Sequence, residues 1–215
     1  MQNHLQTDAL LSKKLTNFRG PIKDASMNTD PEIWASLKTG QQSALESIYN
    51  THIDYLLQYG TRFTRDELLV EDCVHDLFVD LWKNRNGLGM TNSIRAYLLV
   101  ALRRSIIKKV QKKLKHEAGK TPDEYDFKAE LAIDEMIIAA EMSDEQLRRL
   151  QKAMDDLSKR QKEVLYLKYY QEVPYDEISE IMGIGYQSVR NLVATAIRTL
   201  RSLMELLVLV FIFCQ

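Results

Sequence analysis

The feature that most constrains the fold is a short segment, EISEIMGIGYQSVRNLV, which covers residues 177–193. Apolar residues recur there at spacings of three and four on both sides of a Gly-Ile-Gly break, as on the buried faces of two amphipathic helices. The apolar positions are Ile178, Ile181 and Met182 before the break and Ile184, Val189 and Leu192 after it. Gly183 can adopt the positive φ of a tight corner, and the small Ser179 allows the helices to approach closely. The segment therefore predicts a helix–turn–helix.

The second of these helices carries exposed side chains of the types that contact DNA. They are Tyr186, Gln187, Ser188, Arg190, Asn191, Thr195 and Arg198. Arginine can pair with guanine, and asparagine or glutamine with adenine, in the major groove. No acidic residue occurs from Tyr186 through Arg201, which suits a surface that approaches phosphates. We interpret the helix as a DNA reader, although an ordinary helical corner would have the same apolar spacing.

The whole chain is predicted to be all-α, with two small helical domains joined by an acidic linker and the C-terminal domain forming the helix–turn–helix. The 215 residues include only 8 Gly and 4 Pro, and no segment alternates like a strand. We expect a disordered leader at 1–29, a helical bundle at 30–115, the linker at 116–142, the second domain at 143–205 and an apolar tail at 206–215.

Individual helices follow from apolar spacing and capping residues. In the first domain, helices are expected near residues 33–37, 45–53, 68–82 and 93–114, the last capped by Asn92 or Ser93. In the second domain, they are expected at 144–156, 159–170, 175–182 and 186–205. The segments SDEQ (143–146) and SKRQ (158–161) have the capping-box form.

Charge is distributed in blocks that the net charge of −1 conceals. From Arg95 to Lys120 there are nine basic residues and one acid, a net +8, whereas Thr121 to Glu145 holds nine acids and one base, a net −8. The basic block includes Arg95, Arg103 and Arg104 with Tyr97 near its start, and the preceding loop supplies Asn84, Arg85 and Asn86. Unbalanced positive charge beside an aromatic ring favours a polyanion, and single-stranded nucleic acid in particular.

The helix before that loop carries an acidic stripe, which we define as Asp72, Asp76 and Asp80, at positions i, i+4 and i+8. One helix cannot surround a metal ion, and no histidine or cysteine cluster accompanies the stripe, so no metal site is expected. The stripe favours docking on a basic protein surface. We also expect no cofactor, no small-molecule substrate and no catalytic residue. The segment AGKT (118–121) lacks the earlier glycine of a phosphate-binding loop, because Leu114 stands there.

Two motifs in the same order resemble those of extracytoplasmic-function (group 4) sigma factors of the sigma-70 family. They are VEDCVHDLFVDLW followed by IRAYLLVALRRSIIKKVQKK, and LSKRQKEVLYLKYYQEVPYDEISEIMGIGYQSVRNLVATAIRTLR. The resemblance covers residues 32–203, and the apolar tail resembles those of Bacteroidetes-like sigma factors. His75, Asp76, Asp80 and Ser179 depart from the residues that are frequent in the family.

The resemblance implies a role for each set of residues. Asp72, Asp76, Phe78 and Trp82 would dock on the clamp helices of the largest RNA polymerase subunit. The residues Asn84, Arg85, Asn86, Arg95, Tyr97, Arg103 and Arg104 would recognise and melt the −10 promoter element, and the helix from Tyr186 would read the −35 element. The acidic linker would lie in the RNA exit path. Core polymerase and promoter DNA are therefore the expected partners, and an anti-sigma factor is a further candidate.

An alternative function is a helix–turn–helix transcriptional activator with an N-terminal helical sensing domain. Such a protein would need neither the basic helix nor the acidic linker. In either case we expect a cytoplasmic protein, because the first twenty residues contain no apolar run. The tail at 206–213 is too short to span a bilayer, and we expect it to pack on a neighbouring helix or a partner.

Overall fold

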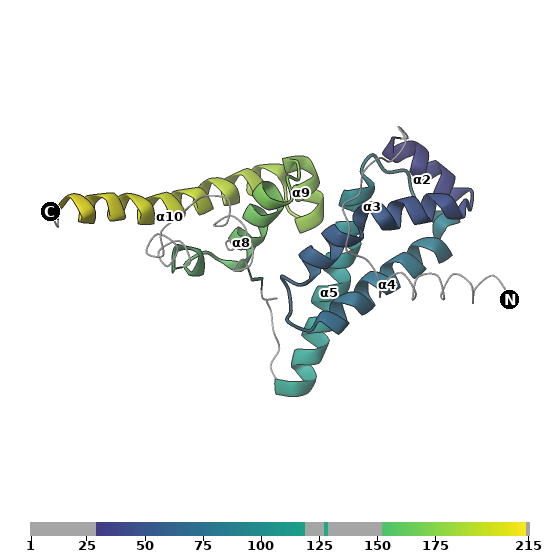
Figure 1. Cartoon of the computed structure of the whole chain (residues 1–215), viewed down its shortest axis with the longest axis horizontal. Helices are drawn as coiled ribbons and strands as arrows, with labels where there is room; N and C mark the ends of the chain where they lie inside the picture. The colour runs from purple at the N-terminus through teal and green to yellow at the C-terminus, as the bar shows by residue number, and fades with distance from the viewer. Residues whose placement is uncertain (1–28, 119–126, 129–151, 214–215) are drawn as a thin grey trace.

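The computed structural model describes residues 29–118, 127–128 and 152–213, and its regular elements in these ranges are all helices (Figure 1). The all-α prediction is therefore confirmed for this part of the chain. Residues 1–28 of the expected leader, most of the expected linker and the capping box at 143–146 lie outside the described residues. None of the described helices is long and apolar enough to cross a membrane.

The N-terminal module, residues 29–118, contains the four helices expected from the sequence. They are α2 (Asp30–Lys38), α3 (Gln42–Gly60), α4 (Glu67–Lys83) and α5 (Ile94–Ala118), with a short 3-10 helix, η1 (Arg85–Gly87), after α4. Helix α3 packs against α2, α4 and α5. Trp34, Leu56, Phe78, Leu98 and Leu102 are almost fully buried between these helices and form the centre of the module.

Capping residues determine where these helices begin. Thr29 and Glu32 form a capping box at α2, and the Asp66 carboxylate accepts a hydrogen bond from the Leu69 amide at α4. The Ser93 hydroxyl accepts from the Ala96 amide, which confirms Ser93 rather than Asn92 as the cap of α5. The first amide of α5, that of Ile94, donates to the Asp30 carboxylate of α2 at 2.8 Å, so the start of one helix is held by another.

The C-terminal module, residues 152–213, contains α8 (Lys159–Leu165), the π-helical segment η2 (Tyr166–Tyr170), α9 (Tyr175–Met182) and α10 (Tyr186–Phe213). The predicted capping box of Ser158 and Gln161 begins α8. The prediction of one regular helix over 159–170 is wrong in its second half, because the backbone widens into a π turn and the Gln171 amide bonds to the Tyr166 carbonyl five residues earlier.

Helix α10 is longer than the sequence predicted. The expected end at residue 205 is wrong, since the helical backbone continues to Phe213 through the apolar segment 206–213. No Gly or Pro occurs in this stretch to end the helix earlier. The side chains of residues 201–213 lie outside the description, so the expected packing of the tail stays a prediction.

The predicted tight turn between α9 and α10 is confirmed. Gly183 has φ 63° and ψ 39°, and its amide donates to the Glu180 carbonyl at the end of α9. Ser179 does more than allow close approach, because its hydroxyl donates to the Ile184 carbonyl at 2.6 Å. The apolar faces of both helices are buried below the turn, as the residues Ile178, Ile181, Met182, Val189 and Val193 show.

The two modules lie against each other and share one continuous core. Figure 1 shows α8 and α9 beside the N-terminal module, with α10 extending away from it, and α9 packs directly on α5. Phe127, which belongs to the predicted linker, is also buried in this core with 1% of its surface exposed. Part of the expected linker therefore contributes to packing between the modules.

Candidate nucleic-acid and polymerase interfaces

The first candidate interface is the solvent-facing side of α10. All seven residues predicted to read DNA are exposed there, and the helix–turn–helix core is buried on the opposite side. Gln187 donates a hydrogen bond from its Nε2 to Asn191 Oδ1 at 3.2 Å, one turn further along. Tyr186, which is 50% exposed, rests edge-on against Tyr175. The helix therefore presents amide, hydroxyl and guanidinium groups on a rigid scaffold, as major-groove readers do.

The residues predicted to recognise the −10 element separate into exposed and structural groups. Asn86 and Arg104 are exposed, and so is Asn84, which ends α4 with a hydrogen bond to the Asp80 carbonyl. Arg85 instead holds the loop together, since its Nη1 donates to the Trp82 carbonyl and its guanidinium lies 4.3 Å from the Trp82 ring centroid.

Tyr97 is half-buried rather than freely exposed. Its ring packs edge-on against Trp34 at 4.9 Å, and burial raises the pKa of its phenol. Tyr97 and Asn84 line the same depression between α4 and α5, which has a volume of about 160 Å³ and is also lined by Asp76 and Asp80. The structure thus brings two predicted −10 residues together with two members of the acidic stripe.

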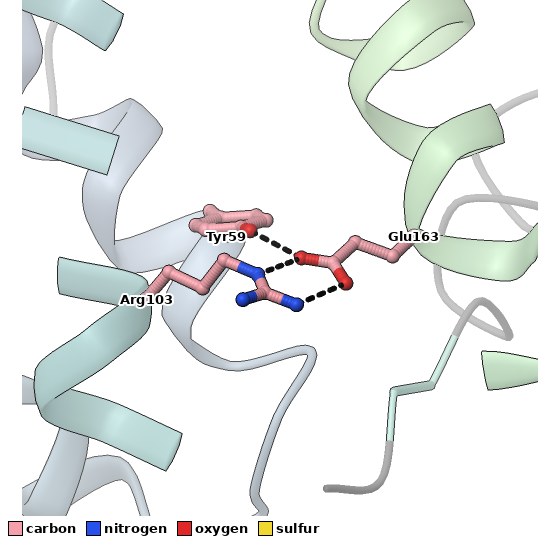
Figure 2. A network of polar contacts seen from close by, with 3 residues as sticks. All are labelled: Tyr59, Arg103 and Glu163. Carbon is pink, nitrogen blue, oxygen red and sulfur yellow. Dashed lines mark hydrogen bonds and ion pairs between the residues drawn. The ribbon is translucent and has the colours of Figure 1, made fainter. Parts of the chain in front are cut away.

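Arg95 and Arg103, also predicted to bind the −10 element, contact the C-terminal module instead of solvent. Arg103 pairs with Glu163 of α8 through Nε–Oε1 at 2.7 Å and Nη2–Oε2 at 3.1 Å, and the Tyr59 hydroxyl donates to the same Oε1 at 2.6 Å. Figure 2 shows these three side chains, which we call the Glu163 cluster, converging from α3, α5 and α8.

Arg95 makes the second polar contact between the modules. Its Nη2 donates to both the side-chain and backbone oxygens of Gln171, and its guanidinium lies over the Tyr55 ring. Glu177 of α9 lies close by. Burial raises the pKa of its carboxyl, and a hydrogen bond from Ser93 and the positive charge of Arg95 partly offset that rise. Two of the predicted DNA-binding arginines are therefore engaged by the C-terminal module, Arg103 by α8 and Arg95 by Gln171, which follows η2.

The second candidate interface is the acidic stripe on α4. Asp72, Asp76 and Asp80 are exposed, and Asp76 forms a surface ion pair with Lys109 at 2.8 Å. Such a pair is weak in solvent and can exchange for a partner's cation. Phe78 is fully buried and so lies in the core rather than on the predicted docking surface, whereas Trp82 is half-buried at its edge.

Comparison with known proteins identifies both modules. The family model for Sigma-70 region 2 matches residues 48–115, and the model for Sigma-70, region 4 matches residues 147–200. The chain belongs to the sigma-70 family of RNA polymerase sigma factors. It is therefore a DNA-binding transcription initiation factor.

Curated relatives of this sigma factor are of the extracytoplasmic-function (ECF) class. It is 23% identical over 169 residues to the ECF RNA polymerase sigma factor SigK of Mycobacterium ulcerans, covering 77% of this chain and 88% of that protein. It is 24% identical over 173 residues to SigL of Mycobacterium tuberculosis strain H37Rv, covering 75% and 89%. These matches support the ECF class for this chain.

Solved structures show the same fold. CnrH, in complex with the cytosolic domain of CnrY, aligns with a TM-score of 0.56 and 19% identity over 83% of this chain and 98% of that chain. RpoE from Bartonella quintana, in complex with the anti-sigma factor NepR, aligns with a TM-score of 0.50 and 18% identity over 74% and 96%.

Sequence reasoning missed the residues that join the two modules. Glu163, Tyr59, Gln171 and Phe127 are buried, yet in the sequence they are ordinary members of helices or of the linker. The one available signal was that Glu163, Leu167 and Tyr170 follow a single helical stripe at spacings of four and three. That pattern indicates a buried face but does not say which surface covers it.

Proposed function

We propose that this sigma factor reads the −35 element with α10 and recognises the −10 element with η1 and the start of α5. The observation that carries the −35 assignment is the exposure of all seven reader residues on α10, opposite a buried helix–turn–helix core. The N-terminal residues of a recognition helix meet base edges in the major groove, so Tyr186, Gln187 and Arg190 are the first candidates for base contact.

We propose that the depression between α4 and α5 receives an unstacked base of the −10 element. Asn84 and Tyr97 line it, and their amide and aromatic ring can hydrogen-bond and stack with a base. Unstacking a base costs a few kcal/mol. Contacts in the depression and with exposed Asn86 and Arg104 would offset that cost.

For polymerase binding, we propose the exposed acidic stripe, with the edge of Trp82, as the surface that meets the clamp helices of the largest polymerase subunit. The match of the N-terminal module to Sigma-70 region 2 supports this function over a transcriptional activator with a sensing domain. A pull-down with purified core polymerase distinguishes the two, because an activator of that kind would not join the core enzyme as its initiation factor.

The decisive experiment is in vitro transcription with core polymerase across a promoter library. We expect the full chain to select one class of promoters that share −35 and −10 elements. Transcripts whose start sites are the same with and without the protein would contradict the proposal.

A variant in the reader tests the −35 assignment. Arg190→Ala should weaken binding to the selected −35 element by about 1–3 kcal/mol if the guanidinium contacts a base, measured by fluorescence anisotropy at fixed salt. Arg160→Ala, which removes an exposed arginine of α8, is the control and should leave that affinity within about twofold. Equal losses for both variants would exclude a specific role for Arg190.

A charge reversal tests the docking surface. Asp72→Arg should weaken association with core polymerase at least tenfold, because it places a cation where the proposed partner surface is basic. Asp54→Arg reverses an exposed carboxylate on α3 of the same module and serves as the control. Unchanged pull-down of core polymerase by Asp72→Arg would show that the docking surface lies elsewhere.

Three finer assignments complete the proposal. We propose that the protein acts in the cytoplasm, where RNA polymerase works. We also propose that it belongs with the Bacteroidetes-like sigma factors, because of its apolar tail. We also propose an anti-sigma factor as a partner, since the two aligned structures are complexes with CnrY and NepR. Co-purification from the native cell tests this last partner.

A further inference from the structure

The loop between α4 and α5, residues 84–93, is fastened to α2. Trp34 of α2 is fully buried, and its Nε1 donates to the Gly89 carbonyl at 2.7 Å. The Asp30 carboxylate accepts from the Ile94 amide at 2.8 Å, where the loop ends and α5 begins. Two side chains of α2 therefore fix the middle and the end of the loop.

The start of the loop is held by Arg85. Its Nη1 donates to the Trp82 carbonyl at 2.7 Å, and its guanidinium lies 4.3 Å from the centroid of the Trp82 ring. Arg85 also meets the turn after α2, where Gly40 has φ 86° and a Cβ would stand only 3.4 Å from Arg85 Nε. The close approach of this turn makes Arg85 part of the frame of the loop, and α2 therefore bounds the loop at three points.

Side chains between these fixed points face solvent. Asn86, Met90 and Asn92 are exposed, and Met90 has 68% of its surface exposed although it is apolar. Amide groups can hydrogen-bond to base edges, and a methionine can contact a base face. A surface held in one shape binds without the cost of ordering its own groups. The loop therefore presents nucleic-acid-compatible side chains on a backbone that is already placed.

Trp34 also contacts the depression between α4 and α5. Its ring packs edge-on against Tyr97 at a centroid distance of 4.9 Å, and Tyr97 lines the depression. One buried side chain of α2 thus touches both parts of the proposed −10 site, the loop through Gly89 and the depression through Tyr97. A shift of Trp34 would displace the two parts together.

We propose that α2 sets the base selectivity of the −10 site, with Trp34 and Asp30 as positioning residues that do not themselves touch DNA. The inference rests on the proposed function and adds residues that the sequence did not single out. A loop held in one shape leaves a wrong base with unpaired donors and acceptors, whereas a mobile loop can rearrange to meet it. The contacts with α2 therefore contribute to discrimination among −10 sequences as well as to affinity.

The test begins with Trp34→Phe, which removes the hydrogen bond to Gly89 and keeps an aromatic ring in the core. Hydrogen exchange followed by mass spectrometry on the full chain should show amides of residues 84–93 exchanging about tenfold faster, with amides of α3 unchanged. In transcription with core polymerase, the preference for the selected −10 element over single-base mismatches should fall about fivefold, which is the contribution of one hydrogen bond. Binding of the −35 element should stay within about twofold.

A control and a rescue separate positioning from general stability. Val74→Ala removes buried volume from the same module, about 14 Å before the end of α4, and should lower Tm while keeping the −10 preference. Gly87→Ala, added to Trp34→Phe, should recover about twofold of the lost preference. Gly87 has no positive φ and has open space for a Cβ, so alanine restricts the released loop without strain.

Several outcomes would overturn the inference. They are unchanged loop exchange in Trp34→Phe, faster exchange with the −10 preference intact, an equal loss of preference in Val74→Ala, and no recovery with Gly87→Ala. If circular dichroism shows that Trp34→Phe loses its helices, Asp30→Ala replaces it, with Asp30→Asn, which keeps an acceptor oxygen, as its control. The proposed function itself fails separately, when the natural chain shows no preference among −10 sequences.

Discussion

Replacing Gly183 by alanine should destabilise the helix–turn–helix through backbone strain alone. Gly183 has φ 63° and ψ 39°, a left-handed conformation that costs an L-residue about 1–2 kcal/mol. A Cβ at this position would meet nothing within 4 Å, so no steric term is added. Alanine also lowers the conformational entropy of the unfolded chain, which raises the free energy of unfolding by about 0.4–1 kcal/mol. The expected net loss in the free energy of unfolding is about 1 kcal/mol.

A second glycine provides a matched control. Gly87 also has open space where a Cβ would stand, but its φ is not positive, so Gly87→Ala should be neutral or stabilising by up to about 1 kcal/mol. The two substitutions are chemically identical and are expected to have opposite signs. Gly183→Asn should lose less than Gly183→Ala, because asparagine tolerates the left-handed region better.

Thermal unfolding followed by circular dichroism measures the effect. For a chain of this size, about 1 kcal/mol corresponds to a fall of about 2–4 °C in Tm. Binding to the −35 element at a temperature well below Tm should change less than for Arg190→Ala, since the reader side chains remain. If Gly183→Ala matches the natural chain, or shifts Tm in the same direction as Gly87→Ala, the reasoning from backbone strain is wrong.

The remaining predictions concern the N-terminal module. Gly60→Ala should lower the free energy of unfolding, measured by chemical denaturation, by about 1–3 kcal/mol, because the alanine Cβ would collide with Val70 Cγ1. The collision outweighs a gain in helix propensity of at most about 1 kcal/mol. Adding Val70→Ala to the same chain should recover part of the loss. Burial lowers the pKa of His52 below its ordinary 6.5, so on acidification the unfolded chain takes up the proton before the folded chain does. The free energy of unfolding should therefore fall as the pH drops below about 6.5. His52→Gln should make that fall smaller when denaturation is measured from pH 7 to 5. Trp34→Phe should cost about 2 kcal/mol and weaken promoter melting, since it removes the 2.7 Å hydrogen bond from Nε1 to the Gly89 carbonyl that holds the loop after α4.

Features encoded by neighbouring residues could be predicted from the sequence. The caps at Ser93 and Ser158, the glycine corner at Gly183 and the four helices of the N-terminal module depend on contacts within a few residues, so spacing and residue type were sufficient. The π turn after Leu165 was missed because the tyrosines that form it have ordinary helical spacing. Its aromatic neighbours, Tyr59 and Phe127, come from distant parts of the chain.

The residues predicted to bind the −10 element also have some properties that neighbouring residues encode and others that depend on distant parts of the chain. Their types and charge followed from composition, but their accessibility did not. Arg95 and Arg103 look like solvated members of a basic helix, and only the tertiary structure pairs them with Gln171 and Glu163, 76 and 60 residues away. Tyr97 likewise has the residue type of a stacking platform, and its burial depends on the contact with Trp34 of α2, which only the tertiary structure shows.

By itself, the sequence determined that the chain is helical, where its turn and caps lie, and which surfaces carry DNA-compatible or acidic groups, because these properties arise from local periodicity and side-chain chemistry. Only the tertiary structure decided which charged groups are free and which are paired between the modules. That choice depends on the burial of Glu163 and Phe127 against residues distant in the chain, and a periodic pattern can mark a buried face but not the surface that covers it.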